Sequence, residues 1–192
     1  MNNSLPKHRP SQPRMVMTLR MAALCAMVVA VPVLHGCASP ATVQGMTVSS
    51  SMMERTNDRL KNAIRIENVS GGKETNPLWT SQVGPNEFRQ ALEGSLGNLG
   101  YLANPAGQAK YALTANLLEL DQPLLGLTLD VTSKVQYQFK GEGIDKSIPI
   151  SATGTATFSD AAVGITRLRI ANEKSILENI KALLKQLAEI TP

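Results

Sequence analysis

Histidine and cysteine are almost absent from this sequence. Its 192 residues include two of each, and His8, Cys25 and His35 all precede the second cysteine, Cys37. Residues 38–192 therefore contain neither an imidazole nor a thiol. This absence excludes Ser-His-Asp and Cys-His catalysis from that part of the chain, removes the usual zinc ligands, and leaves no disulfide within it. The fold there has to be stabilised by its apolar core.

A surplus of positive charge is also missing beyond the first 36 residues. The chain has 19 basic and 15 acidic residues, but Lys7, Arg9, Arg14 and Arg20 lie in that first part, which has no acidic residue. The remainder is formally neutral. Binding of nucleic acid requires clustered Lys and Arg, and no such cluster occurs, so we expect no nucleic-acid partner.

The four basic residues precede an apolar stretch, residues 21–34, that is shorter than the about 20 residues of a membrane-spanning helix. This is the layout of a secretory signal peptide. The ending Leu34-His35-Gly36-Cys37 resembles the lipobox of bacterial lipoproteins, in which Leu34 and Gly36 would be recognised by the signal peptidase. His35 departs from the pattern, since a small residue is usual there. The alternatives are an uncleaved anchor and a chance cysteine.

The resemblance to lipoproteins implies an attachment and a location. The sulfur of Cys37 would be lipidated, and Cys37 would become the first residue of a mature chain carrying three acyl chains, enough for stable anchoring. Ala38 stands where such proteins carry their sorting signal and resembles the outer-membrane default. We therefore expect a periplasm-facing protein on the inner leaflet of the outer membrane, with no metal or cofactor.

The sequence after the lipobox divides into a tether and one domain. Residues 37–61 are polar and Ser-rich, which favours a flexible tether, and a short strand within 42–48 is a further option. Alternatively, its three methionines, the first being Met46, could dock on the domain or on a partner. With residues 1–36 as signal peptide, residues 62–192 remain as a single α/β domain.

Hydrophobic periodicity predicts four strands and two helices in this domain. In chain order they are strand 63–69, helix 84–100, strands 110–121, 127–140 and 148–158, and helix 167–190. Because each element has one apolar face, the economical assembly is an α+β two-layer sandwich. It has a four-stranded, mainly antiparallel sheet with both helices on one face, in the order β-α-β-β-β-α, and the other face of the sheet is polar.

Some details of the prediction concern the ends of these elements. The alternation places Leu127 and Phe158 on the inward face of their strands, and residues 141–146 are expected to form a turn. Asn172 or Asp160 is expected to cap the last helix.

The lipobox and the order of elements together resemble the small α/β domains of periplasmic outer-membrane lipoproteins. Among these are the lipopolysaccharide-assembly lipoprotein and the auxiliary lipoproteins of envelope lipid transporters. The resemblance includes no residue motif. The leading hypothesis for the function of this protein is a lipid-tethered binding or assembly module that engages an envelope protein or an amphiphile through the polar sheet face and apolar loops. A structural lipoprotein without a dedicated ligand and a carboxylate-based enzyme are the alternatives.

The link between two predicted strands is unusual for a turn, because Leu124 and Leu125 lie between Pro123 and Gly126. Either the leucines fold back over the end of the sheet, or they are presented outward to a partner. Trp79, the only tryptophan, is a further partner-binding candidate, although burial in the core is the favoured interpretation for it.

Two groups of charged residues offer weaker hypotheses. Glu119 and Asp121 lie two apart on one strand face and could act as an acid-base pair or bind a cation, but a solvated strand end is favoured. A charge cluster near the start of the last helix is interpreted as a solvated face, with binding of an anion or a lipid headgroup as the alternative. It consists of Arg167, Arg169, Glu173 and Lys174. We expect no catalytic residue and no enzymatic activity.

Overall fold

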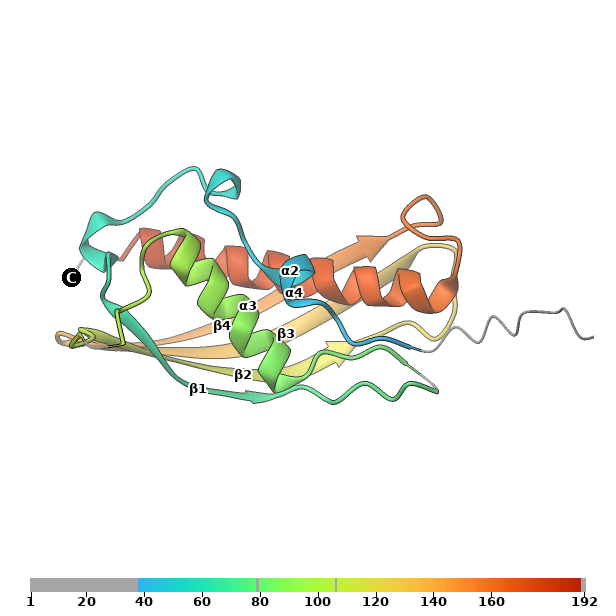
Figure 1. Cartoon of the computed structure of the whole chain (residues 1–192), viewed down its shortest axis with the longest axis horizontal. Helices are drawn as coiled ribbons and strands as arrows, with labels where there is room; N and C mark the ends of the chain where they lie inside the picture. The colour runs from blue at the N-terminus through green and yellow to red at the C-terminus, as the bar shows by residue number, and fades with distance from the viewer. Residues whose placement is uncertain (1–37, 79, 106, 191–192) are drawn as a thin grey trace, which may run out of the picture. The chain divides into compact units, whose positions relative to one another are not determined.

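A four-stranded sheet with two long helices on one face forms the described part of the chain, as the sequence predicts (Figure 1). The structure is a computed structural model that describes residues 38–78, 80–105 and 107–190. The strands are β1 (Ile64–Gly71), β2 (Tyr111–Asp121), β3 (Leu129–Gly141) and β4 (Ile144–Ala156). The helices are α2 (Val43–Met46), α3 (Pro85–Asn98) and α4 (Gly164–Ala188), with 3₁₀ turns at Ser50–Met52 and Asp58–Leu60. Among these residues, no helix is long and apolar enough to cross a membrane.

The strands follow one another across the sheet in the order β1-β2-β3-β4. β1 and β2 are parallel and are joined through α3, whereas the β2–β3 and β3–β4 pairs are antiparallel. The turn between β3 and β4 consists of Glu142 and Gly143 alone, both with positive φ (45° and 82°). This is the backbone of a two-residue hairpin. The expected turn at 141–146 is therefore too long, because residues 144–146 already pair in β4.

The hydrophobic core lies between the sheet and the two helices. The inward positions of β2 and β3 alternate as predicted, and the helical stripes of α3 and α4 pack against them. The fully buried side chains include Phe88, Leu92, Leu96, Leu113, Tyr137, Phe139, Ile176, Ile180 and Leu184. This layer is the apolar core that the sequence requires in the absence of disulfides.

Two residues predicted to point inward are exposed instead. Leu127 is 75% exposed and Phe158 is 60% exposed. The pairing of β3 with β4 ends at Leu129 and Ala156, so both residues lie beyond the last rung of the sheet. The alternation in the sequence continues past the point where the strand pairing ends.

Helix α4 approaches β4 closely enough that only glycine fits at position 154. A Cβ atom at Gly154 would collide with the backbone nitrogen of Ser175 and the carbonyl oxygen of Ala171, both on α4. Gly154 thus allows direct contact between the helix backbone and the strand.

A buried polar network fixes the position of α4 over β3. The Tyr137 hydroxyl donates to Asn179 Oδ1 at 2.9 Å, and Asn179 Nδ2 donates to the carbonyl oxygen of Ser133 at 3.2 Å. Ser133 Oγ donates to the carbonyl oxygen of Ser175, also at 3.2 Å. Complete burial raises the pKa of Tyr137 and keeps the phenol protonated. Because each of these polar side chains has a partner, their burial is compatible with a stable core.

Residues 38–61 pack on the domain, in contrast to the expected tether. The side chains of Met46 and Val48 are fully buried, and α2 takes the place of the possible strand. The Val48 amide donates to Ser95 Oγ at 2.9 Å, and Asn98 Nδ2 donates to the Val48 carbonyl, also at 2.9 Å. The folded unit therefore includes residues 38–61 and does not start at residue 62. Docking of Met46 on the domain, the alternative interpretation, agrees with the structure.

Candidate functional site

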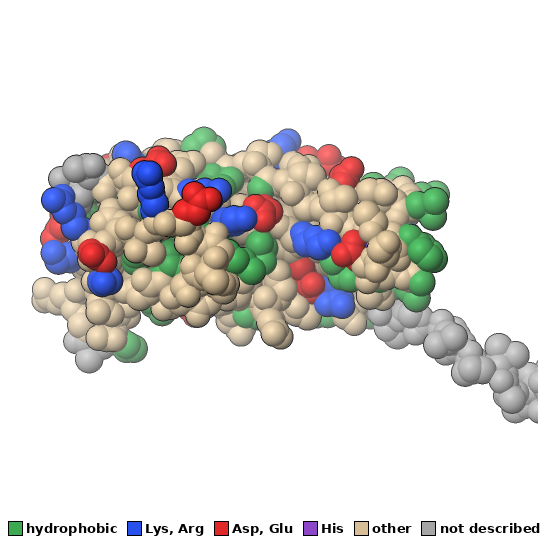
Figure 2. All heavy atoms as spheres, turned by 90° about the horizontal axis from the view of Figure 1, so that it is seen from above, with side chains coloured by type: hydrophobic (Ala, Val, Ile, Leu, Met, Phe, Trp, Pro, Cys, Tyr) green, Lys and Arg blue, Asp and Glu red, His purple; other side chains and the backbone are tan. Residues whose placement is uncertain are grey.

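Exposed apolar side chains gather at one end of the domain, where the β2–β3 loop (122–128) and the β4–α4 loop (157–163) lie. Together with Pro77 and Leu78, we call these loops the apolar loop end. Leu124 and Leu125 are 97% and 92% exposed, so they are presented outward and do not fold back over the sheet. The other exposed apolar side chains here are Leu78, Leu127, Phe158 and Val163. Figure 2 shows apolar side chains at this end of the molecule and charged side chains over the rest of the face.

The first turn of α4 forms the floor of an open cleft at the apolar loop end. Gly164, Ile165 and Leu168 line it from the helix, opposite the loop residues 123–126. The N-cap residue is Val163, which makes no side-chain capping bond, and the first turn carries no acidic residue. The expected cap by Asn172 or Asp160 is therefore wrong, because the helix starts earlier than the sequence predicts, at Gly164.

Arg167 holds the two loops together. Its Nη1 donates to the carbonyl oxygen of Ala161 at 2.7 Å and its Nη2 to that of Gly126 at 2.9 Å. The guanidinium carbon lies 5.8 Å from the centre of the Phe158 ring, within the range of a cation–π contact. Arg167 is only 5% exposed, so it is not part of a solvated face. Its side chain is a cross-brace that fixes one loop relative to the other.

Side-chain amides form the base of the apolar loop end. Gln122 Nε2 donates to the Ser81 carbonyl at 2.9 Å and to Asn172 Oδ1 at 2.7 Å. Asn172 Nδ2 donates to the same Ser81 carbonyl at 3.0 Å, and Gln82 Nε2 donates to Gln122 Oε1 at 2.9 Å. The buried Asn172 thus ties α4 to the start of the β2–β3 loop.

The first described residues are fastened at this same end. The Ala38 amide donates to the Pro77 carbonyl at 2.8 Å, and Ser81 Oγ donates to the Ser39 carbonyl at 2.7 Å. Figure 1 shows the blue start of the described chain at the end where the two loops lie. Ala38 therefore lies at the same end of the domain as the two loops.

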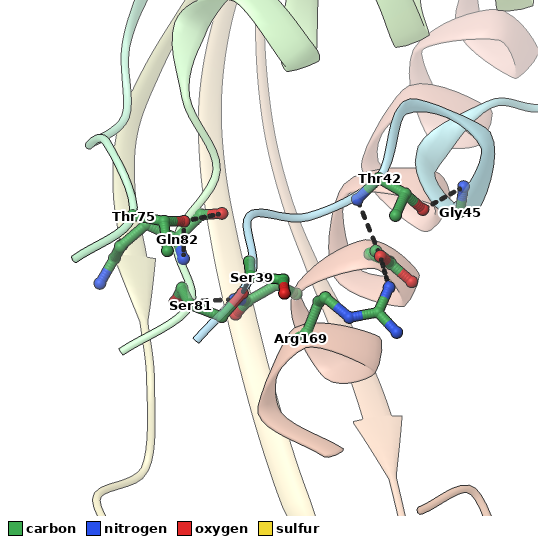
Figure 3. A network of polar contacts seen from close by, with 9 residues as sticks. Ser39, Thr42, Gly45, Thr75, Ser81, Gln82 and Arg169 are labelled. Atoms are coloured by element: carbon green, nitrogen blue, oxygen red, sulfur yellow. Dashed lines mark hydrogen bonds and ion pairs between the residues drawn. The ribbon is translucent and has the colours of Figure 1, made fainter. Parts of the chain in front are cut away.

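A carboxylate on α4 continues this attachment (Figure 3). The Thr42 amide donates to Glu173 Oε1 at 2.8 Å, and the same oxygen accepts from Arg169 Nη1 at 2.6 Å. Both Glu173 and Arg169 belong to the charge cluster that the sequence favours as a solvated face. In the structure Glu173 binds the N-terminal segment to the helix, and Arg169 pairs with Glu173.

Asp160 stabilises the β4–α4 loop. Its Oδ2 accepts from the Thr157 amide at 2.7 Å and its Oδ1 accepts from Lys174 Nζ at 2.8 Å. The bond to Lys174 and the bond to the Thr157 amide lower the pKa of Asp160 from 3.8 to about 2. A carboxylate with a lowered pKa stabilises the fold while it is ionised.

We predict that Asp160→Asn removes one source of acid sensitivity. In the native protein the Asp160 contribution is complete above pH 4 and is lost as the pH falls through about 2, where the folded-state carboxylate takes up a proton. Urea unfolding at pH 5 and pH 2 should show the native protein more stable than the variant at pH 5 and a smaller difference at pH 2. A constant difference would contradict the assigned contacts.

The two predicted strand carboxylates lie on the open, polar face of the sheet. Glu119 Oε2 accepts from Lys134 Nζ at 2.7 Å across the β2–β3 pair, with both side chains about half exposed. The bond to Glu119 raises the pKa of Lys134. Among the residues that the structure describes, no three His, Cys, Asp or Glu side chains gather to hold a metal ion. Glu119 is therefore placed in a polar ladder of cross-strand pairs.

Four of the site residues predicted from the sequence lie outside the described residues. They are Leu34, Gly36 and Cys37 of the lipobox, and Trp79. Among the predicted partner-binding residues, Leu124 and Leu125 are described and lie together. The residues that sequence reasoning missed here are Gln122, Asn172 and the loop-bracing role of Arg167. No periodic pattern marks them, because their partners lie far away in the chain.

No family model matches the chain, and no curated protein does. Solved structures of similar fold include a protein from Caulobacter crescentus described as a "putative lipoprotein", which is 15% identical, with 64% of this chain and 87% of that one covered and a TM-score of 0.43. A Xanthomonas campestris protein of the DUF330 family model is 9% identical, with 70% and 90% covered and a TM-score of 0.49. A hypothetical protein of Chlamydia trachomatis is 10% identical, with 66% and 93% covered and a TM-score of 0.41. The function therefore has to be argued from this chain's own residues.

Proposed function

We propose that this protein is a lipid-anchored binding or assembly module of the bacterial envelope. It faces the periplasm from the inner leaflet of the outer membrane and engages an envelope protein or an amphiphile. The basic segment, the short apolar stretch and the lipobox ending at Cys37 support the anchor, and Ala38 supports the outer-membrane location. The chain has no histidine or cysteine after Cys37, and Glu119 is paired with Lys134. Both observations support binding over catalysis.

One observation carries the proposal: the predicted lipidation site immediately precedes a residue that is fastened to the apolar loop end. Ala38 is hydrogen-bonded to Pro77, beside the exposed Leu78. Monomeric soluble proteins rarely expose a contiguous apolar patch unless it marks an interaction site. The proposed anchor would therefore be one residue away from the end of the domain that we propose to be the binding surface.

The open face of the sheet offers a second surface, suited to a protein partner. Polar side chains cover it in cross-strand pairs, among them Thr132 with Thr153 and Lys140 with Asp145. A surface of this kind gives a partner hydrogen bonds and charge complementarity, which favour specificity.

Replacing Cys37 with serine should abolish lipidation, because the first lipid group is attached through the cysteine sulfur, which serine lacks. Metabolic labelling with a radioactive fatty acid should mark the native protein and leave Cys37→Ser unlabelled and its signal peptide uncleaved. His35→Ala is the control, since a small residue there restores the lipobox pattern; it should be labelled at least as well as the native protein. Equal labelling of Cys37→Ser and native protein would refute the anchor.

A further inference from the structure

We propose that the membrane itself covers the apolar loop end, with the side chains of the two loops inserted into the interfacial region of the leaflet that holds the anchor. This inference rests on the proposed lipidation of Cys37. The proposed function leaves open whether an amphiphile or a protein binds the apolar loop end. This inference assigns the membrane to that surface.

The position of the anchor gives the first reason. Consecutive Cα atoms are about 3.8 Å apart, so the residue bearing the acyl chains is one peptide unit from Ala38. The Ala38 amide is hydrogen-bonded to Pro77, and the Ser39 carbonyl accepts from Ser81. These two hydrogen bonds fix Ala38 and Ser39 to the domain, so no flexible linker follows the anchor to separate the domain from the bilayer. A protein partner on the loop end would have to fit between the domain and its own membrane.

The composition of the surface gives the second reason. Six of the eight large apolar side chains exposed among the described residues belong to the apolar loop end. Residues 75–83 and 122–129 contain no charged residue. In the β4–α4 loop the one charged residue is Asp160, and Lys174 pairs with it. The exposed leucines and Phe158 carry no charge and lose no ionic hydration when they enter the interface, which favours insertion over an aqueous contact.

The rigidity of the loops gives the third reason. Arg167 binds the carbonyl groups of Gly126 and Ala161, and Gln122 anchors the start of the β2–β3 loop to Ser81 and Asn172. Leu124 and Leu125 are therefore held outward with little further ordering needed on binding. Preorganisation of this kind lowers the entropic cost of association.

The test uses the lipidated mature protein in vesicles of phosphatidylethanolamine and phosphatidylglycerol. Residues 38–192 contain no cysteine, and lipidation would block the sulfur of Cys37, so Leu125→Cys provides a single site for a nitroxide label. Thr153→Cys, an exposed position on the open face of the sheet, is the matched control. The label at 125 should be relaxed by oxygen, which concentrates in lipid, and the label at 153 by an aqueous nickel complex. Labels accessible to nickel at both positions would overturn the inference.

Two further measurements distinguish the ways in which this inference could be wrong. A label at 125 shielded from both reagents would indicate a protein cover and would also overturn the inference. An unlipidated chain that starts at Cys37→Ser, without the signal peptide, should bind the same vesicles weakly. Adding Leu124→Ser with Leu125→Ser should reduce that binding by about tenfold or more, since two leucine side chains are then no longer transferred from water into the membrane. The melting temperature should stay the same, because both side chains are exposed. Absence of fatty-acid label on the native protein would refute the anchor alone, while vesicle binding by the chain that starts at Cys37→Ser reports on the loop end itself.

Discussion

Gly154→Val should lower the free energy of unfolding by about 3 kcal/mol or more, the upper end of the cost of overpacking a core. The cost is high because the new side chain would meet the backbone of α4 at Ala171 and Ser175, and a backbone cannot turn aside as a flexible side chain can. Helix α4 would have to move off β4, which would weaken the buried bonds of Asn179. The change can be measured by urea unfolding, monitored by circular dichroism, of a chain that starts at residue 37 and carries Cys37→Ser.

Ser151→Val is the matched control for Gly154→Val. Ser151 lies on the same strand but is exposed on the open face of the sheet, and valine is favourable in strands. The free energy of unfolding should therefore change by no more than about 0.5 kcal/mol. Similar losses in the two variants would show that α4 does not touch β4 at Gly154.

Met46→Asp should also be strongly destabilising, by about 3 to 5 kcal/mol if the segment stays in place, since it would bury a carboxylate without a partner. Met46 is fully buried between the N-terminal segment and the helices. Release of the segment would return the carboxylate to water, so the measured cost has the free energy of undocking as its upper limit. Either way the Val48 amide, which donates to Ser95, should lose protection from hydrogen exchange.

Met52→Asp makes the same chemical change six residues away, at a side chain that is 43% exposed. It should leave the free energy of unfolding and the exchange of the Val48 amide nearly unchanged. Equal and small effects of the two substitutions would instead mean that residues 38–61 behave in solution as the flexible tether that their composition favours.

The sequence by itself determined the fold class and most of the elements. In β3 the alternation of Val131, Val135 and Tyr137 with polar residues can be satisfied only by a strand with one buried face. The spacing of Phe88 and Leu92 predicted the face of α3 in the same way. These patterns are local and periodic, because each is set by the geometry of a single strand or helix. The lipobox is also a local motif, so the anchor could be predicted without the tertiary structure.

Only the tertiary structure decided where each pattern stops. Leu127 and Phe158 continue the alternation of their strands, yet they are exposed because the β3–β4 pairing stops two residues short of each, at Leu129 and Ala156. Met46 and Val48 are buried without any periodic signal, because an irregular segment packs one side chain at a time. No spacing in the sequence could distinguish them from the exposed residues around them.

The candidate site was predicted only in part, for the same reason. The run of leucines at 124 and 125 marked the loop, since apolar residues in a turn break a local rule. Their outward direction, the brace from Arg167 and the nearness of Ala38 depend on contacts between residues that are 40 or more positions apart, such as Arg167 with Gly126 and Ser81 with Ser39. Such contacts are set by how the layers pack, and packing is decided only when the whole chain has folded.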